Sequence, residues 1–253
     1  MKIGLVMSGG AVHGVAHLGA LKALTELQIP LHAISGVSSG AIAGAFFAAG
    51  YTPEEIYKLA TELPYWQLAK PAFNKRGLIR LDKLEKEFSK YLGNKTFEDL
   101  NLPLFICATD LRQGTTVYFS SGNLITPLLA SNTVPLLSPP VEYQNHLLVD
   151  GGLLNNLPVE CLLNITDFRI ALHVNPMNTQ AELKTFRSIL ERTCHLAINN
   201  NVHPRLSLCN LIIEPPALKY FSLTDLKNAR FMFEAGYEHT ISLADKLVAL
   251  KNS

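Results

Sequence analysis

The sequence has no run of one charge, and its total charge is almost balanced. It carries 22 basic and 21 acidic residues, which gives a formal net charge of +1. A protein that holds nucleic acid through phosphate contacts needs a basic surface or stripe. The charge pattern therefore argues against a nucleic-acid partner.

Long apolar runs and metal-ligand spacings are also missing. The small-apolar stretch Ala41–Gly50 is too short to span a bilayer, and the apolar run after Lys2 is too short for a signal peptide. We therefore expect a cytoplasmic protein. Cysteines are few and scattered through apolar or helical segments, so we interpret them as reduced core residues and expect no metal. The four are Cys107, Cys161, Cys194 and Cys209.

No internal repeat, low-complexity tract or linker divides the chain. At 253 residues with 48% hydrophobic content it can bury one large core, so we expect a single domain over residues 1–253. Strand and helix patterns alternate, which indicates a layered α/β domain. Strands are predicted at Lys2–Met7, Leu104–Ala108, Thr116–Ser120, His146–Val149, Phe168–Val174 and Asn210–Ile213, and helices at Val15–Leu27, Pro53–Glu62, Leu81–Tyr91, Leu124–Ser131 and Asp225–Leu250.

A short motif predicts a nucleophile. Gly36-Val37-Ser38-Ser39-Gly40 lies between the apolar run Leu31–Ile34 and the stretch Ala41–Gly50. This is the strand-turn-helix setting of a nucleophile elbow, in which Ser38 would stand at the tip. Gly36 and Gly40 would let the backbone turn sharply without a Cβ collision.

A glycine-rich loop follows the first predicted strand. Ser8-Gly9-Gly10-Ala11-Val12-His13-Gly14 leads directly into a predicted helix, so several backbone N–H groups and the positive end of the helix dipole converge. Such a loop can bind a phosphate or an oxyanion. Because neither a Gly-Lys-Ser/Thr ending nor a complete G-x-G-x-x-G is present, nucleotide binding is the poorer interpretation.

The motif Asp150-Gly151-Gly152 supplies a candidate base. Acyl transfer needs a nucleophile, a proton acceptor and preorganised donors for the oxyanion, and Ser38, Asp150 and the Gly9–Gly14 loop offer one of each. Burial would raise the pKa of Asp150 and improve it as a base. Gly151 and Gly152 would let its carboxylate approach another loop closely. Alone, the motif also fits a plain turn after a strand.

Histidine decides between this arrangement and an ordinary Ser-Asp-His triad, in which histidine comes last. We expect His173, inside an apolar run, and His195, inside a helix, to be structural. His203 precedes Pro204 in what we predict to be a polar loop, and His239 lies on the last predicted helix. His17 is expected to support the glycine-rich loop.

The segment 63–77 mixes aromatic and basic residues and is broken by two prolines. It is either a lid or interfacial patch suited to a lipid headgroup boundary, or aromatic core with solvated cations outside. The residues concerned are Tyr65, Trp66, Lys70, Phe73, Lys75 and Arg76.

Several of these motifs, taken together and in order, resemble the bacterial patatin-like phospholipases. The resemblance is strong over about residues 2–160, and residues 161–253 would complete the strands and helices. The motifs are Ser8-Gly9-Gly10 with Gly14, His17 and Gly19, then Gly36-Val37-Ser38-Ser39-Gly40, Ala108-Thr109-Asp110-Leu111, Ala130-Ser131, Pro135, and Asp150-Gly151-Gly152 with Asn155, Asn156 and Pro158.

The resemblance implies a three-layer α/β/α fold with a mostly parallel sheet. It implies a catalytic dyad of Ser38 and Asp150, an oxyanion hole at Gly9, Gly10 and Ala11, and a lipid or acyl-ester substrate cleaved without metal or cofactor. Basic residues in segment 63–77 would favour lipid substrates, with peripheral contact at the inner membrane face. Nothing in the sequence indicates an oligomeric state.

Two residues depart from the family pattern. Ala11 stands where a third glycine is usual, and His13 where arginine or lysine is usual. A Cβ restricts positive φ at Ala11, and His13 is not a permanent cation. A lipid-binding or regulatory protein with little catalysis therefore stays open as an alternative to lipid acyl hydrolysis. An acyltransferase is a close variant of the hydrolase, and the sequence does not separate the two.

Overall fold

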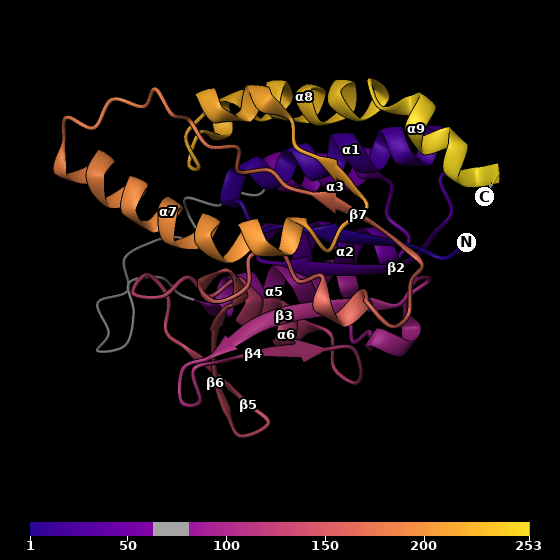
Figure 1. Ribbon diagram of the computed structural model, residues 1–253. Coiled ribbons are helices and arrows are strands. Elements are labelled where there is room, and N and C mark those ends of the chain that lie inside the picture. Colours follow the sequence, from indigo (N-terminus) through magenta and orange to yellow (C-terminus); the bar gives the residue numbers. More distant parts are fainter. Residues whose placement is uncertain (63–80, 253) are drawn as a thin grey trace.

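The computed structural model describes residues 1–62 and 81–252, and within them eight strands form one mixed sheet (Figure 1). Strands β3, β2, β1, β7 and β8 are neighbours in that order and run parallel. Strands β4 and β6 pair antiparallel with β3, and β5 pairs antiparallel with β6. The strands are β1 (Ile3–Met7), β2 (Leu31–Val37), β3 (Leu104–Asp110), β4 (Thr115–Phe119), β5 (Val141–Tyr143), β6 (His146–Asp150), β7 (Phe168–Leu172) and β8 (Leu211–Ile213).

Helices flank this mostly parallel sheet, so the predicted α/β fold is confirmed. The α-helices are α1 (Val15–Glu26), α2 (Ser39–Ala48), α3 (Pro53–Glu62), α5 (Leu81–Leu92), α6 (Ile125–Ser131), α7 (Phe186–Leu206), α8 (Ala229–Ile241) and α9 (Ala244–Ala249). Short 3₁₀ turns are η1 (Ala11–Gly14), η2 (Phe97–Asp99), η3 (Gly151–Leu153), η4 (Glu160–Leu162), η5 (Pro216–Tyr220), η6 (Leu226–Asn228) and η7 (Leu250–Asn252).

Strand β1 shows why both faces of the sheet are covered. All five of its residues are buried, and successive side chains point to opposite faces. Leu5 belongs to the main core cluster with residues of α1, α2, α5 and α6. Val6 faces a second cluster that contains Leu162 of η4 and Val202 of α7. The sheet is therefore the middle of three layers.

Helix α8 forms a further cover over α1 (Figure 1). The two helices meet at glycines: a Cβ on Gly19 would lie 1.9 Å from the Phe233 carbonyl oxygen, and one on Gly236 would lie 2.0 Å from that of Ala16. Backbones can approach this closely only where no side chain intervenes. The crossing binds the C-terminal part of the chain to the first helix.

The single helix predicted over Asp225–Leu250 is wrong. The segment begins with turn η6, continues as α8, and breaks at Ser242 before α9. Ser242 Oγ donates to the His239 carbonyl oxygen at 2.7 Å. Such side-chain bonds compete with the helical hydrogen-bond ladder near its end.

The polar loop predicted around His203 is also wrong. His203 and Pro204 lie within the last turn of α7, where the Arg205 guanidinium donates to the Asn201 carbonyl oxygen. Pro204 has no N–H and leaves the last turn one backbone hydrogen bond short, and the bond from Arg205 supports that turn. The prediction that the four cysteines lie in the core is wrong for Cys194, which is exposed on the same helix. All four cysteines are free thiols.

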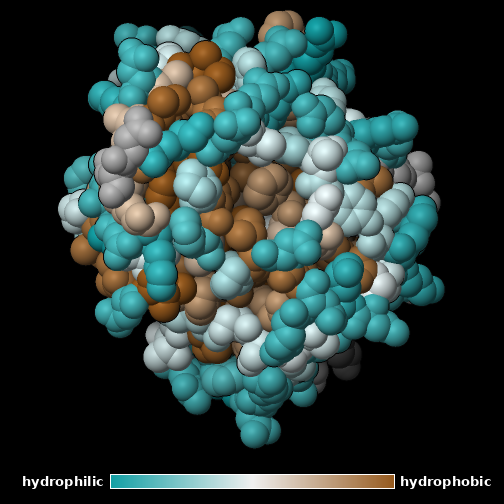
Figure 2. Space-filling model, turned by 90° about the vertical axis from the view of Figure 1, so that its right-hand side faces the viewer, coloured by the Kyte–Doolittle hydropathy of each residue, from teal (hydrophilic) through white to brown (hydrophobic). Residues whose placement is uncertain are grey.

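The two ends of the sheet differ. The chain termini lie at the right-hand side of Figure 1, and the carboxyl ends of the parallel strands point to the left. Figure 2 shows the right-hand side, where hydrophobic side chains gather in a central hollow within a hydrophilic surround. Among the described residues, no helix is both long and apolar enough to cross a membrane.

Candidate active site

Ser38 occupies the turn between β2 and α2. Its backbone has φ 53° and ψ −127°, a conformation that residues with a Cβ rarely adopt. Such conformations persist only where the surrounding structure enforces them, and they cluster at active sites. The turn carries the geometry of a nucleophile elbow.

The two elbow glycines are needed for close packing. A Cβ on Gly40 would lie 2.4 Å from the Met7 carbonyl oxygen, and one on Gly36 would lie 2.7 Å from that of Gly40. Neither glycine has positive φ, and both avoid the Cβ collision that the sequence led us to expect at these positions. The serine itself adopts the left-handed conformation, and the glycines let the elbow press against the end of β1.

Asp150 lies at the end of β6, where its carboxylate meets the Ser38 side chain. The residue is 7% exposed, and its Oδ1 accepts from the Gly152 N–H at 2.8 Å. Burial raises the pKa of the Asp150 carboxyl to about 6, while hydrogen bonds from the Ser38 hydroxyl and the Gly152 N–H lower it. The structure thus brings together the two residues that lie far apart in the sequence.

Gly151 allows this approach. A Cβ there would lie 2.6 Å from the Cys107 carbonyl oxygen, so β6 and the turn after it press directly against β3. The close approach expected for the two glycines after Asp150 is therefore confirmed at Gly151.

Ser131 is a supporting residue to which the sequence assigned no role. Its Oγ accepts from the Ser38 N–H at 2.9 Å and donates to the Cys107 carbonyl oxygen at 2.6 Å. The side chain is fully buried at the end of α6. It links the elbow to β3, and only its place beside Ala130 in the family motif signalled it.

The glycine-rich loop after β1 lies against the elbow. A Cβ on Gly9 would lie 3.1 Å from the Ser38 Cβ. Among the described residues, the N–H groups of Gly9, Gly10 and Ala11 have no hydrogen-bond acceptor. Unpaired N–H groups beside a serine, near the N-terminus of α2, form a place where negative charge is stabilised.

Ala11 takes up a left-handed conformation with φ 48°. The loop therefore requires at this position the geometry that glycine adopts most easily. Gly14 is fixed by packing, because a Cβ there would lie 2.4 Å from the Ser39 Cβ.

Three asparagines connect the loop to the Asp150 turn. Asn156 and Asn175 both donate from Nδ2 to the Gly9 carbonyl oxygen. Asn201 of α7 accepts from the Asn156 N–H at 2.8 Å and donates to the Gly152 carbonyl oxygen at 3.1 Å. Because a trans peptide points its C=O and N–H in opposite directions, anchoring the Gly9 carbonyl also orients the Gly10 N–H.

Two buried histidines contact backbone carbonyl oxygens in and around the glycine-rich loop. Burial lowers the pKa of His17 to about 4, and its Nε2 donates to the Ser8 carbonyl oxygen at 2.7 Å, so the expected supporting role is confirmed. Burial also lowers the pKa of His13, whose ring nitrogens face the carbonyl oxygens of Val174 and Phe221. A neutral His13 fits the expectation that it is no permanent cation.

Within the described part of the chain, no histidine forms a hydrogen bond with the side chain of Ser38 or Asp150. His173 pairs with Glu214 at 2.6 Å, and His195 faces the Asn175 carbonyl oxygen at 3.3 Å. His239 is on α8, and no described cluster of three or more His, Cys, Asp or Glu side chains could hold a metal ion. The predicted lid segment 63–77 lies outside the described residues.

Comparison with solved structures identifies the fold class. VipD from Legionella pneumophila superimposes with a TM-score of 0.67 at 15% identity, covering 97% of this chain and 67% of VipD. ExoU, in its heterodimeric complex with SpcU from Pseudomonas aeruginosa, gives 0.54 at 16% identity, covering 98% of this chain and 52% of that one. At such low identity these similarities show a shared α/β fold.

Sequence comparison identifies the family. The family model described as patatin-like phospholipase matches residues 5–163, well over half of the chain, so the chain belongs to that family. An uncharacterized NTE family protein of Mycobacterium tuberculosis is 32% identical over 177 residues, 69% of this chain and 49% of that protein. Neuropathy target esterase sws of Drosophila melanogaster is 31% identical over 171 residues, 64% and 12% respectively. The chain thus spans about half, or less, of the length of these relatives.

Proposed function

We propose that this chain is a lipid acyl hydrolase that cleaves carboxylic esters through a dyad of Ser38 and Asp150. The observation that carries the proposal is the place of the Ser38 side chain against the buried Asp150 carboxylate, beside a loop with unpaired N–H groups. Nucleophile, proton acceptor and oxyanion donors are the three parts that acyl transfer needs.

The raised pKa of Asp150 makes its carboxylate a better base than an exposed aspartate. In acylation, Asp150 takes the proton of the Ser38 hydroxyl while Oγ bonds to the acyl carbon, and then gives that proton to the leaving alcohol. In deacylation, it takes a proton from water as the water oxygen attacks the acyl-enzyme, and returns it to Ser38 Oγ. A pKa of about 6 leaves the carboxylate mostly ionised at neutral pH.

The N–H groups of Gly9, Gly10 and Ala11 would stabilise the negative charge that develops on the carbonyl oxygen. Their loop is held by Asn156 and Asn175, so little reorganisation is needed when the charge forms.

Contact with a lipid surface fits the exposed apolar side chains near this end of the sheet. Leu136 is 90% exposed in the loop that begins at Thr133, whose carbonyl oxygen accepts from the Asp150 N–H at 2.8 Å. Phe186, at the start of α7, is 81% exposed. Side chains of this kind insert into the interfacial region of a membrane. We propose peripheral membrane contact of a cytoplasmic protein.

Hydrolysis of p-nitrophenyl butyrate and of phosphatidylcholine vesicles tests the function. We expect Ser38→Ala and Asp150→Asn to lower kcat/KM by at least about 10⁴-fold, because each removes a group that acts in the reaction. Ser39→Ala is the matched control, because the Ser39 Oγ is buried next to the site without a hydrogen-bond partner among the described residues. Turnover that survives in Ser38→Ala would overturn the proposal.

A lipid-binding protein with little catalysis is the second candidate, and the conformation of Ala11 favours it. A strained loop residue could misplace one oxyanion donor. A protein of this kind would bind vesicles but release no fatty acid. Product analysis with an added alcohol acceptor separates hydrolysis from acyl transfer, since a transferase would produce the new ester.

A further inference from the structure

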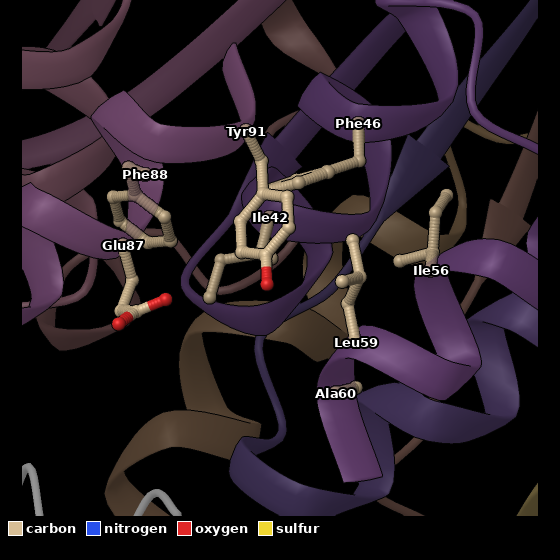
Figure 3. A pocket seen from close by; sticks show the side chains of 8 residues that line it. All are labelled: Ile42, Phe46, Ile56, Leu59, Ala60, Glu87, Phe88 and Tyr91. Carbon is tan, nitrogen blue, oxygen red and sulfur yellow. The ribbon is translucent and has the colours of Figure 1, made fainter. Parts of the chain in front are cut away.

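Helix α7 approaches the candidate active site from the face of the sheet opposite α2. Val202 of α7 packs in the second core cluster with Leu162 of η4. Helices α2, α3 and α5 belong to the main cluster on the other face, where they line the small apolar crevice drawn in Figure 3. Side chains of α7 therefore contact the loops of the site from a side that these three helices do not occupy.

Three consecutive asparagines in the interior of α7 differ in what their side chains contact. Among the described residues, the side chains of Asn199 and Asn200 form no hydrogen bond, whereas that of Asn201 uses both its oxygen and its nitrogen. Asparagine is a poor helix former, because its side chain competes for nearby backbone groups. Asn201 instead bonds a distant segment. It also lies outside residues 5–163, the part of the chain that the family model matches.

Asn201 bridges the two ends of the turn that follows Asp150. Its Nδ2 donates to the Gly152 carbonyl oxygen at 3.1 Å, and its Oδ1 accepts from the Asn156 N–H at 2.8 Å. Gly152 in turn donates its own N–H to Asp150 Oδ1 at 2.8 Å. Because glycine has no side chain to restrict its backbone, a bond on its carbonyl side helps to fix the direction of its N–H. Asn201 therefore acts on the Asp150 carboxylate through Gly152.

The bridge continues to the glycine-rich loop through Asn156. The Asn156 side chain donates to the Gly9 carbonyl oxygen at 3.3 Å. A Cβ on Gly9 would lie 2.4 Å from Asn156 Oδ1, and one on Gly152 would lie 2.7 Å from the same atom. The Asn156 side chain thus lies between the loop and the turn, and Asn201 holds its backbone.

The end of α7 that carries Asn201 is fixed by packing and by an ion pair. Val202, the next residue, is 1% exposed. Arg205 Nε donates to Glu160 Oε1 at 2.6 Å, and Glu160 Oε2 accepts from Asn155 Nδ2 at 2.9 Å. Little rearrangement is therefore needed for Asn201 to keep its two bonds.

We propose that Asn201 is a positioning residue for the reaction: it aims the Gly152 N–H at the Asp150 carboxylate and, through Asn156, fixes the loop that supplies the oxyanion donors. The proposal rests on the proposed function and adds a residue to it. Among the described residues, Asn201 has no hydrogen bond to the side chain of Ser38 or Asp150. Its loss should therefore weaken catalysis without abolishing it.

Replacement by leucine tests the assignment. Asn201→Leu removes both bonds at nearly constant volume, and Asn200→Leu makes the same change at the neighbouring, exposed position. We expect Asn201→Leu to lower kcat for p-nitrophenyl butyrate about 10- to 50-fold with KM changed less than about threefold, because the base and the oxyanion donors are less well placed. Asn200→Leu should stay within about twofold of wild type.

The pH profile separates positioning from a general loss of folded protein. The Gly152 N–H lowers the pKa of Asp150, so a poorly aimed N–H raises that pKa above its value of about 6. We expect the acidic midpoint of kcat/KM in Asn201→Leu to rise by about half a pH unit or more. The buried Cys107 thiol beside Asp150 stays neutral over this range, because burial raises its pKa well above the ordinary value. An unchanged midpoint, or an equal rise in Asn200→Leu, would overturn the proposal.

Two further measurements keep the outcome clear. Asn201→Ala removes the same two bonds without a bulky side chain and should reproduce both effects, so a failure of Asn201→Leu to fold does not block the test. A ¹³C NMR titration of the Asp150 carboxyl, assigned by the loss of its signal in Asp150→Asn, measures the pKa without turnover. A higher Asp150 pKa in Asn201→Ala than in wild type supports the positioning role even if no ester is hydrolysed. Ester turnover with equal Asp150 pKa values in the two proteins rejects the role of Asn201 alone.

Discussion

Ser38 and Ala11 follow neighbouring parallel strands, and both hold a left-handed backbone conformation, with φ 53° and 48°. Ser38 is enclosed by close packing at Gly36 and Gly40 and by the bond to Ser131. Ala11 is exposed, and its loop is held mainly by hydrogen bonds that come from distant parts of the chain. The positive φ is therefore enforced by close packing at the elbow and mainly by hydrogen bonds at the loop, so substitutions at the elbow should have the larger effects.

The largest effect is expected from Gly40→Ala. The added Cβ would meet the Met7 backbone at 2.4 Å, and neither segment can move without shifting β1 or the elbow. We expect a loss of about 3 kcal/mol of stability, or about 10 °C in Tm, together with loss of esterase activity. Gly44→Ala on the same helix is the control, because its nearest neighbours are side-chain methyl groups at 3.0 and 3.3 Å, which can give way. Equal Tm values for the two variants would contradict the account of the elbow.

Ser131→Ala loosens the elbow without adding bulk. It removes the acceptor of the Ser38 N–H and the donor to the Cys107 carbonyl oxygen. We expect kcat for p-nitrophenyl butyrate to fall about 10- to 100-fold with KM changed less than threefold, because positioning of the nucleophile is lost. Ser39→Ala serves again as control. A change confined to KM would show that Ser131 acts on substrate binding.

The pH dependence follows from Asp150. With its pKa raised to about 6, protonation removes the base, so kcat/KM should fall about tenfold between pH 8 and pH 5. The stability of the fold changes with pH in the opposite direction to the activity. A carboxyl whose folded pKa lies above its unfolded value costs stability once the pH rises through the folded pKa.

Asp150→Asn should accordingly raise Tm at pH 8 while it abolishes turnover. Two pKa units correspond to at most about 3 kcal/mol. The Tm of Asp150→Asn minus the Tm of wild type should be larger at pH 8 than at pH 4. A smaller difference at pH 8 than at pH 4 would contradict the burial of an ionised carboxylate.

The smallest effect is expected at the loop. Ala11→Gly relieves the left-handed strain, and we expect a gain of up to about 1 kcal/mol in stability with kcat/KM within threefold of wild type. Thermal unfolding and ester hydrolysis measure both. A tenfold rise in kcat/KM would instead indicate that Ala11 limits catalysis, as the second candidate function requires.

The sequence predicted most of the elements, because their patterns are local. Helix Pro53–Glu62 was predicted at its observed bounds, and Val15–Leu27 within one residue. The failures depend on individual side-chain hydrogen bonds near helix ends. The break at Ser242 and the helical position of His203 arise from side-chain bonds that no local period reveals. Cys194 was predicted to lie in the core because the sequence indicated a helix there. The sequence did not indicate which face of that helix is exposed.

The candidate site also contains residues that the sequence predicted and residues that it did not. Ser38 and Asp150 stand in short motifs whose chemistry is readable, and the role assigned to each stays a prediction. Asn175 and Asn201 stand in no such motif, and Ser131 is signalled only by its place beside Ala130, because each acts through contacts with distant backbone groups. Only the folded chain brings them to the elbow and the loop.

Labelling with a fluorophosphonate in the presence of a metal chelator tests the central claim most directly. We predict that one equivalent reacts with the wild-type protein, that peptide mass mapping places the label on Ser38, and that Ser38→Ala is not labelled while Ser39→Ala is. Label on another residue, or no label on a correctly folded wild-type protein, would contradict the assignment of Ser38 as an activated nucleophile.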